Sequence, residues 1–316
     1  MINNDDIQFL ISKADDLLRN CQNAIILSKH GNVLSKNGQY NKAFKLFERS
    51  LQLQPDNIIT LTSYGNGLSK AGRHEKACEI FESSLQINPD NIIALTSYGK
   101  ALAESGNYEK ACEIFESSLQ INPDNIIALT SYGKALAESG NYEKACEIFE
   151  SSLQINPDNI IALTSYGKAL AESGNYEKAC EIFESSLQIN PDNIIALTSY
   201  GKALAESGNY EKACEIFESS LQINPNDLIA LTSYGKALAE SGNYEKACKI
   251  FESSLQINPD NIIALTSYGK ALAESGNYEK ACEIFESSLQ INPDNIIALN
   301  SYGKALAESG NYEKAC

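Results

Sequence analysis

The stretch PDNIIALTSYGKALAESGNYEKACEIFESSLQINP, residues 89–123, decides the fold, because the chain repeats it almost unchanged every 34 residues. Eight full copies run from residue 24 to residue 295, and a ninth begins at residue 296. The prolines keep the same spacing, and they are Pro55, Pro89, Pro123, Pro157, Pro191, Pro225, Pro259 and Pro293. A fixed period of this length predicts a solenoid, in which each unit packs only on its neighbours.

The first half of the copy predicts a helix, because its apolar residues recur at steps of three and four. Asp90 or Asn91 can cap the start of this helix, and Ser105-Gly106 can end it because glycine adopts the left-handed conformation of a C-cap. The residues of the apolar face are Ile92, Leu95, Tyr98, Gly99, Leu102 and Ala103.

The second half predicts another helix after a turn of about two residues. Asn107 can cap its start, and Asn122-Pro123 ends it because proline disfavours the helical conformation of the residue before it. Its apolar stripe consists of Tyr108, Ala111, Cys112, Phe115, Leu119 and Ile121. The two helices, each of about 14 residues, are therefore expected to pack antiparallel.

Small residues on the two stripes predict a close approach of the helix pair. Gly99 and Ala111 allow the backbones to come together, while Leu95 and Phe115 fill the space beside them. The substitution Gly99→Leu is therefore predicted to overpack this contact at a cost of roughly 1–3 kcal/mol.

The pattern Leu95-x-x-Tyr98-Gly99-x-x-Leu102, Ala111-x-x-x-Phe115 and Pro123 resembles the tetratricopeptide repeat, whose pattern is Trp-x-x-Leu-Gly-x-x-Tyr, Ala-x-x-x-Phe and Pro. The resemblance extends from Ala24 to Cys316. This chain departs from the family in having Leu95 where Trp is usual and in exchanging an aromatic and an aliphatic residue at Tyr98 and Leu102. The resemblance implies an all-α fold, a right-handed superhelical α-solenoid of antiparallel helix pairs.

The repeat also predicts how the chain is divided. Residues 1–23 are expected to form an N-terminal capping helix that begins near Asn4 or Asp5 and covers the apolar side of the first unit. Because the chain stops early in the second helix of the ninth unit, we expect a fragment or a shortened reading frame. The predicted units of the array are 24–57, 58–91, 92–125, 126–159, 160–193, 194–227, 228–261, 262–295 and a truncated 296–316.

The charge of the chain excludes several classes of partner. The sequence has 25 Lys and Arg against 41 Asp and Glu, so its net charge of −16 would repel nucleic acid and anionic lipid. The N-terminus lacks the basic and apolar regions of a signal peptide, and no apolar run has the length of a membrane span. We therefore expect a cytoplasmic protein with no nucleic-acid or membrane partner.

The residues that could carry chemistry are few. Eight of the nine cysteines, from Cys78 to Cys316, recur every 34 residues. Equivalent residues in neighbouring units should lie about 10 Å apart, beyond the roughly 7 Å limit between the Cα atoms of a disulfide, so we expect reduced thiols in the core. No CxxC motif or Cys/His cluster predicts a metal or cofactor. His30 and His74 occupy different places in their units, so no repeated catalytic base exists and no enzyme activity is expected.

The resemblance implies that the first helices line a concave inner surface that receives a partner. In the unit quoted above, Thr96, Ser97, Lys100 and Glu104 are then the candidates, although Lys100 and Glu104 alone would also make an ordinary surface pair worth a few tenths of a kcal/mol. The remaining predicted partner-binding residues are Thr130, Lys134, Glu138, Thr164, Lys168, Glu172, Thr198, Lys202, Glu206, Thr232, Lys236, Glu240, Thr266, Lys270, Glu274, Asn300, Lys304 and Glu308.

These residues favour a protein-interaction scaffold that binds an extended segment or a helix of another protein. One alternative is the substrate-recruiting arm of a larger enzyme, such as a glycosyltransferase or a signalling enzyme, with its catalytic domain beyond Cys316. A second alternative is a structural array that associates with itself head to tail, because an uncovered end unit can contact the leading face of another copy.

Overall fold

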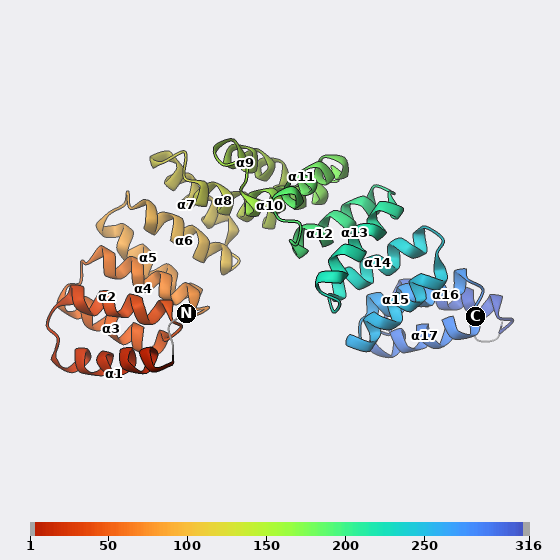
Figure 1. The fold of residues 1–316 in the computed structure, drawn as a ribbon, viewed down its shortest axis with the longest axis horizontal. Helices are drawn as coiled ribbons and strands as arrows, with labels where there is room; N and C mark the ends of the chain where they lie inside the picture. Colours follow the sequence, from red (N-terminus) through yellow and green to blue (C-terminus); the bar gives the residue numbers. More distant parts are fainter. Residues whose placement is uncertain (1–3, 312–316) are drawn as a thin grey trace. The chain divides into compact units, whose positions relative to one another are not determined.

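The computed structural model describes residues 4–311, which form eighteen α-helices and no strand (Figure 1). The helices are α1 (Asn4–Asn20), α2 (Ala24–Lys36), α3 (Tyr40–Leu53), α4 (Ile58–Lys70), α5 (His74–Ile87), α6 (Ile92–Glu104), α7 (Tyr108–Ile121), α8 (Ile126–Glu138), α9 (Tyr142–Ile155), α10 (Ile160–Glu172), α11 (Tyr176–Ile189), α12 (Ile194–Glu206), α13 (Tyr210–Ile223), α14 (Leu228–Glu240), α15 (Tyr244–Ile257), α16 (Ile262–Glu274), α17 (Tyr278–Ile291) and α18 (Ile296–Glu308). The predicted all-α fold of paired, repeating helices is confirmed.

The chain divides into two compact units, Met1–Pro157 and Asp158–Cys316, here called unit 1 and unit 2. In unit 1, α2, α4, α6 and α8 are the first helices of their pairs, and each packs on the second helix that follows it. Each second helix from α3 to α7 also packs on the next first helix, and consecutive first helices contact one another. Unit 2 repeats this arrangement from α10 to α18, and α1 packs on α2 and α3 in unit 1.

The predicted helix boundaries are confirmed by their caps. The Asn91 side chain accepts a hydrogen bond from the Ala94 backbone N–H at the start of α6. Gly106 follows the end of α6 with a φ of +83°, a conformation that glycine adopts without the steric cost of a Cβ atom. The Asn107 side chain then caps α7 by accepting a hydrogen bond from the Lys110 N–H. The short turn between these caps makes the two helices antiparallel.

The core contains most of the predicted apolar residues and several that the prediction missed. Leu95, Tyr98, Leu102, Ala111 and Phe115 are all buried. The predicted core omitted four buried residues of this repeat, and they are Ala94, Thr96, Ala101 and Ser118. A first helix is covered by its own second helix, by the preceding second helix and by neighbouring first helices, so more than one of its faces is buried.

One predicted core position is wrong, because Ile121 is 41% exposed at the end of α7. Apart from the cysteine, the other predicted apolar positions that are not fully buried are half-buried, and they are Ile92, Ala103, Tyr108 and Leu119. The prediction that the cysteines lie in the core is only partly correct. The repeated cysteines from Cys78 to Cys248 are half-buried, whereas Cys282 is buried. Burial raises the pKa of the Cys112 thiol, which makes this thiol less reactive. Cys316 lies outside the described residues.

The glycine in the middle of α6 allows a close contact within the helix pair. A Cβ atom built on Gly99 would lie 2.7 Å from Cε1 of Phe115, which is closer than real Cβ atoms approach a neighbour. Phe115 itself is completely buried. Gly99 is therefore required so that the phenylalanine ring of α7 can lie directly on the backbone of α6.

Candidate functional site

Each first helix exposes one stripe of side chains. On α6 this exposed stripe consists of Ile93, Ser97, Lys100 and Glu104, which are spaced by four, three and four residues and therefore share a face. Ile93 is 66% exposed, Ser97 is half-buried, and Lys100 and Glu104 are exposed. The same four positions recur on the other first helices, and the name exposed stripe is used for all of them.

The threonines predicted to face a partner are buried instead. Thr96 is only 7% exposed, and its hydroxyl shares a hydrogen bond of 3.1 Å with the Ser118 hydroxyl of α7. Its Oγ1 also accepts a hydrogen bond from Nδ2 of Asn125, the residue that caps α8. Consecutive side chains on a helix point about 100° apart. Thr96 therefore faces the second helix, although its neighbour Ser97 lies on the exposed stripe.

This part of the site prediction is therefore wrong for a whole class of residues. The buried threonines are Thr96, Thr130, Thr164, Thr198, Thr232 and Thr266. Each shares a hydrogen bond with a buried serine of its own second helix. These hydroxyls satisfy one another inside the helix pair, as buried polar groups require. Asn300, at the equivalent position of α18, is exposed.

The predicted lysines and glutamates lie on the exposed stripe. They are Lys100, Lys134, Lys168, Lys202, Lys236, Lys270 and Lys304, with Glu104, Glu138, Glu172, Glu206, Glu240, Glu274 and Glu308. The surface pair considered as an alternative does not form on α6: among the described residues, no ion pair joins Lys100 to Glu104. Contact of these residues with a partner stays a prediction.

The stripes of consecutive first helices lie side by side in unit 1. Nδ2 of Asn32 on α2 donates a hydrogen bond of 3.0 Å to Oγ of Ser63 on α4. These residues occupy the positions of Lys100 and Ser97 in the repeat. The hydrogen bond therefore joins the middle of one stripe to the middle of the next.

The sequence prediction did not include a row of exposed isoleucines. Each first helix begins with two adjacent apolar residues, and only one of them can face the core. The second of the pair is exposed by more than half, as in Ile25, Ile59, Ile93 and Ile127 of unit 1 and Ile161, Ile195, Ile229, Ile263 and Ile297 of unit 2. Recurrence of this pair in every copy was the signal that could have found the row.

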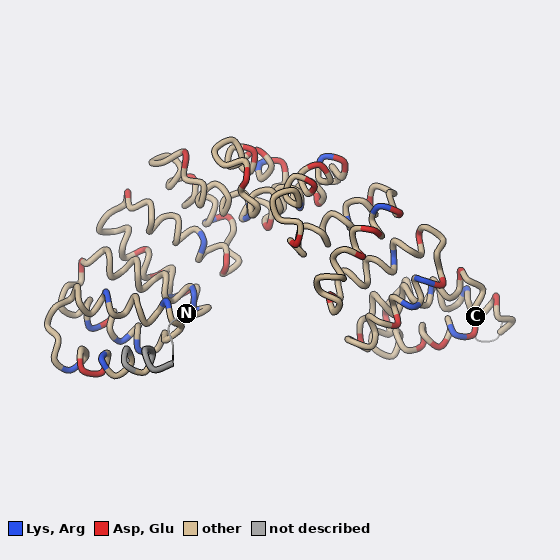
Figure 2. The backbone as a smooth tube through the Cα atoms, in the orientation of Figure 1, with Lys and Arg blue, Asp and Glu red and all other residues tan. Residues whose placement is uncertain are grey.

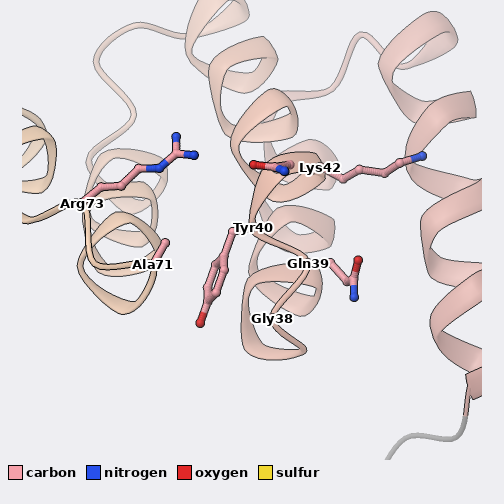
Figure 3. Close-up of a pocket in the computed structure, with 7 residues that line it drawn as sticks. Gly38, Gln39, Tyr40, Lys42, Ala71 and Arg73 are labelled. Atoms are coloured by element: carbon pink, nitrogen blue, oxygen red, sulfur yellow. The ribbon is translucent and has the colours of Figure 1, made fainter.

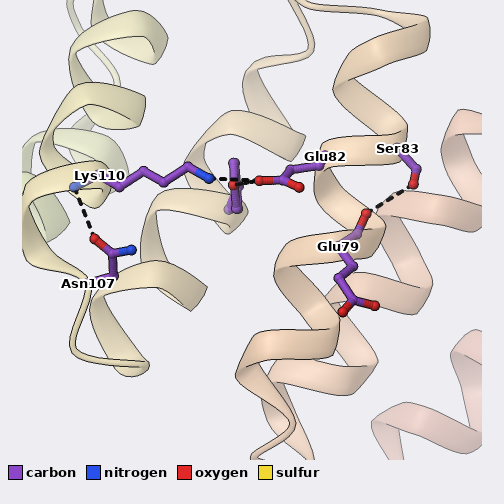
Figure 4. A network of polar contacts seen from close by, with 6 residues as sticks. Glu79, Glu82, Ser83, Asn107 and Lys110 are labelled. Carbon is purple, nitrogen blue, oxygen red and sulfur yellow. Dashed lines mark hydrogen bonds and ion pairs between the residues drawn. The ribbon is translucent and has the colours of Figure 1, made fainter.

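A second polar arrangement joins neighbouring repeats on the opposite side of the first helix. Glu82 of α5 accepts hydrogen bonds from the Tyr98 hydroxyl of α6 and from Lys110 Nζ of α7, the latter at 2.8 Å (Figure 4). Lys110 Nζ also lies 5.5 Å from the centroid of the Tyr98 ring, a favourable cation–π distance. We call this arrangement the Glu–Tyr–Lys clamp. It recurs as Glu116–Tyr132–Lys144, Glu184–Tyr200–Lys212, Glu218–Tyr234–Lys246 and Glu252–Tyr268–Lys280.

The clamp shifts the pKa values of its members in the directions that its geometry requires. The hydrogen bond from Lys110, followed by that from Tyr98, lowers the pKa of Glu82. Burial, followed by the hydrogen bond to Glu82, raises the pKa of Tyr98 to about 12. The hydrogen bond to Glu82 raises the pKa of Lys110. The lysine of each clamp is therefore committed to an internal contact.

The clamps predict a loss of stability in acid. A glutamate whose pKa is lowered in the folded state stabilises the fold above its unfolded pKa of about 4.5, and this contribution is lost as the pH falls through the folded pKa. The triple substitution Glu184→Gln, Glu218→Gln and Glu252→Gln should therefore reduce the fall in melting temperature between pH 7 and pH 3. Each clamp glutamate is about half exposed, so its contribution should not exceed about 1 kcal/mol.

The matched control changes glutamates on the outward side of the second helices, Glu181→Gln, Glu215→Gln and Glu283→Gln. This triple variant has the same change in charge and should keep the acid dependence of the parent chain. Circular dichroism melts at several pH values measure both variants. An equal effect of the two triple variants would show that general charge repulsion, and not the clamp, sets the acid dependence.

Charge is distributed unevenly along the chain. Residues 1–91 contain ten Lys or Arg and ten Asp or Glu, so the whole excess of acidic residues lies in residues 92–316. Figure 2 shows basic residues along α2 to α5. Lys36 and Lys70 occupy the position that Glu104 has on α6. The exposed stripes of α2 and α4 therefore carry no acidic residue.

Two shallow pockets lie between successive turns in unit 1. One, of about 260 Å³, is lined by residues of the turn that begins at Gly38 together with Ala71 and Arg73 (Figure 3). The other, of about 490 Å³, occupies the equivalent place between the turn at Gly106 and Ser139. Within residues 4–311, no group of three or more His, Cys, Asp or Glu side chains is placed to hold a metal ion. None of the helices in that range has both the length and the apolar composition of a membrane span.

Comparison with known families agrees with the repeat geometry. One model of the tetratricopeptide repeat matches residues 22–90, and another matches residues 68–130, 204–267, 238–286 and 272–315, which together cover more than half of the chain. The chain belongs to the tetratricopeptide repeat family. A model described as the cytochrome c-type biogenesis protein H TPR domain matches residues 115–227. No curated protein matches this tetratricopeptide repeat chain.

Solved tetratricopeptide repeat structures share the fold of this chain at low sequence identity. A protein from Parabacteroides merdae is 20% identical with a TM-score of 0.61, and the match covers 79% of this chain and 98% of the other. The APC/C hetero-tetramer Cut9–Hcn1 is 16% identical with a TM-score of 0.62, with coverage of 84% and 52%. YrrB, described as a TPR protein with an unusual peptide-binding site, is 23% identical with a TM-score of 0.51, with coverage of 60% and 97%. Tetratricopeptide repeats are commonly scaffolds for protein–protein interaction.

Proposed function

We propose that this tetratricopeptide repeat protein is a non-catalytic scaffold that binds an extended segment of a partner protein along the exposed stripes of its first helices. The observation that carries the proposal is the row of exposed isoleucines. Ile59, Ile93 and Ile127 each leave more than half of their surface in water, at the same place on consecutive helices in contact. Exposed apolar surface repeated in this way is typical of a binding face.

Polar residues beside the isoleucines support the same assignment. Lys100 lies two turns from Ile93 on the same face and has no hydrogen bond or ion pair among the described residues, whereas Lys110 is held in a clamp. In this repeat Lys110 thus stabilises the stack, and Lys100 is available to a partner. Because the stripe recurs, weak contacts on successive helices add up within one bound segment, and the avidity supplies the strength.

The relatives are consistent with this function. YrrB is described as having a peptide-binding site, and Cut9–Hcn1 is an assembly of different chains. We also propose a cytoplasmic location. The described cysteines form no disulfide, and an array with a half-buried thiol in most repeats suits a reducing compartment.

The test places a photoreactive benzophenone side chain on two faces of the full chain. One variant carries it at Ser131, in the exposed stripe of α8, and the matched control carries it at Ser151, on the outward side of α9. After irradiation in cell extract, the cross-linked peptides are identified by mass spectrometry. The proposal expects a recurrent partner segment at Ser131 and not at Ser151. Cross-links to the same segment from Ser151 alone, or none from Ser131, would contradict it.

A further inference from the structure

We infer that the segment bound by unit 1 is acidic and carries an apolar side chain at every third residue. This inference rests on the proposed function and specifies the chemistry of the partner. The binding face of unit 1 consists of the exposed stripes of α2, α4, α6 and α8. Two independent features of this face support the inference, and they are the unpaired charges on α2 and α4 and the spacing of the isoleucines.

The charges on the stripes of α2 and α4 are all positive and form no ion pair within the described residues. The stripe of α2 carries Lys29 and Lys36, and the stripe of α4 carries Lys70. All three are exposed, and none forms a hydrogen bond or an ion pair within the described residues. Glu104 is an acidic residue on the next stripe, that of α6. Its carboxylate lies 3.1 Å from Nδ1 of His74, so it already has a polar partner within the chain.

Three lysines elsewhere in unit 1 have acidic partners of their own chain. Lys42 is paired with Asp15, Lys110 with Glu82, and Lys144 with Glu116. In a chain with a net charge of −16, the stripes of α2 and α4 are therefore a local excess of positive charge. Carboxylates of a partner are the groups that complement this excess, because opposite charges favour encounter and fix the orientation of binding.

The spacing of the isoleucines sets the period of the partner. Ile25, Ile59, Ile93 and Ile127 occupy one position on four consecutive first helices that contact one another. The axes of packed helices are about 8–10 Å apart, so the isoleucines should follow one another at about that distance. A polyproline II segment advances about 3.1 Å per residue with three residues per turn, or about 9 Å per turn.

One apolar side chain per turn of such a segment can therefore meet one isoleucine per helix. The next residue of each turn projects about 120° away, which lets its carboxylate reach the lysines while the third residue stays in water. A β-strand places side chains on one side about every 6.6 Å, so it falls out of register after two helices. The face thus favours a three-residue period over a two-residue period.

The experiment uses fluorescent peptides whose C-terminus is amidated, so that no terminal carboxylate takes part. The probe has five Leu-Asp-Pro triplets. One control has the same composition with the leucines grouped together, and another has Lys in place of Asp. Fluorescence anisotropy with the full chain should show binding of the probe at least tenfold tighter than binding of either control.

The chain itself offers matched variants. Lys36→Glu with Lys70→Glu gives α2 and α4 the residue that later repeats have at this position, so the fold should tolerate both changes. Lys45→Glu with Lys249→Glu makes the same change in charge on the outward side of α3 and α15, again toward the residue of the other repeats. The first pair should weaken probe binding at least tenfold, and the second less than twofold. Far-UV circular dichroism checks that both variants remain folded.

Each outcome decides a separate point. Equal binding of the probe and the grouped-leucine control would overturn the three-residue period. Equal loss of affinity in the two double variants would overturn the assignment to α2 and α4. Absence of binding by every peptide would overturn the inference as a whole. If the cross-links at Ser131 persist in that case, the proposed scaffold function stands, whereas their absence contradicts that function directly.

Discussion

Phe115→Ala is expected to lower the free energy of unfolding by about 3–5 kcal/mol, the usual cost of removing a fully buried phenylalanine. The Phe115 ring is completely buried between α6 and α7, and its centroid lies 6.2 Å from that of Tyr132 on α8. Its loss would therefore leave a cavity at the junction of three helices. Because each repeat is stabilised through its neighbours, such a cavity weakens the stack as well as one helix pair.

Denaturant titration followed by circular dichroism measures this change. The control is Ile93→Ala, which removes a smaller apolar side chain from an exposed position of α6 and should cost less than about 1 kcal/mol. Similar effects of the two substitutions would contradict the distinction between the core and the exposed stripe. The Ile93→Ala variant also serves the binding experiments, since it changes the binding face with little effect on folding.

Gly99→Ala should lower the free energy of unfolding by about 1–3 kcal/mol, even though alanine is favoured over glycine in a helix by about 1 kcal/mol. The added methyl group would lie 2.7 Å from Cε1 of Phe115 and 2.8 Å from Cζ. The ring has no empty space to move into, because it is fully buried. The larger Gly99→Leu should cost more than Gly99→Ala for the same reason.

A double substitution separates this contact from helix propensity. Phe115→Leu removes the ring that the new methyl group would strike, so Gly99→Ala with Phe115→Leu should cost less than the sum of the two single changes. Additive effects would mean that the ring does not limit the size of the residue at position 99. A more stable Gly99→Ala variant would contradict the close packing of α6 and α7 altogether.

Local sequence signals predicted the helices and their ends. Asn91, Gly106 and Pro123 act on their own few residues, through a cap, a left-handed turn and a restricted backbone, and no distant residue alters these effects. The recurrence of apolar residues at steps of three and four likewise predicted the buried face of α6, with Leu95, and that of α7, with Phe115. These features depend on short stretches, and the structure confirms them.

The candidate site was predicted only in part. Lys100 and Glu104 lie on the exposed stripe as expected, while Thr96 is buried against Ser118 and Asn125. Helical spacing alone places Thr96 at the border between the exposed stripe and the packed face. A polar residue at this border can point toward water or toward the next helix. Ile93 was left out of the predicted binding residues, although it is exposed on the same stripe as Lys100.

By itself, the sequence determined the period of 34 residues, the pairing of the helices and membership of the tetratricopeptide repeat family. Only the tertiary structure decided which polar side chains are used inside the stack. Glu82 meets Tyr98 and Lys110, residues 16 and 28 positions away, because the stacking of α5 on α6 and α7 brings them together. The period shows that such residues recur, but three helices must pack together before Lys110 becomes committed to a clamp while Lys100 remains exposed.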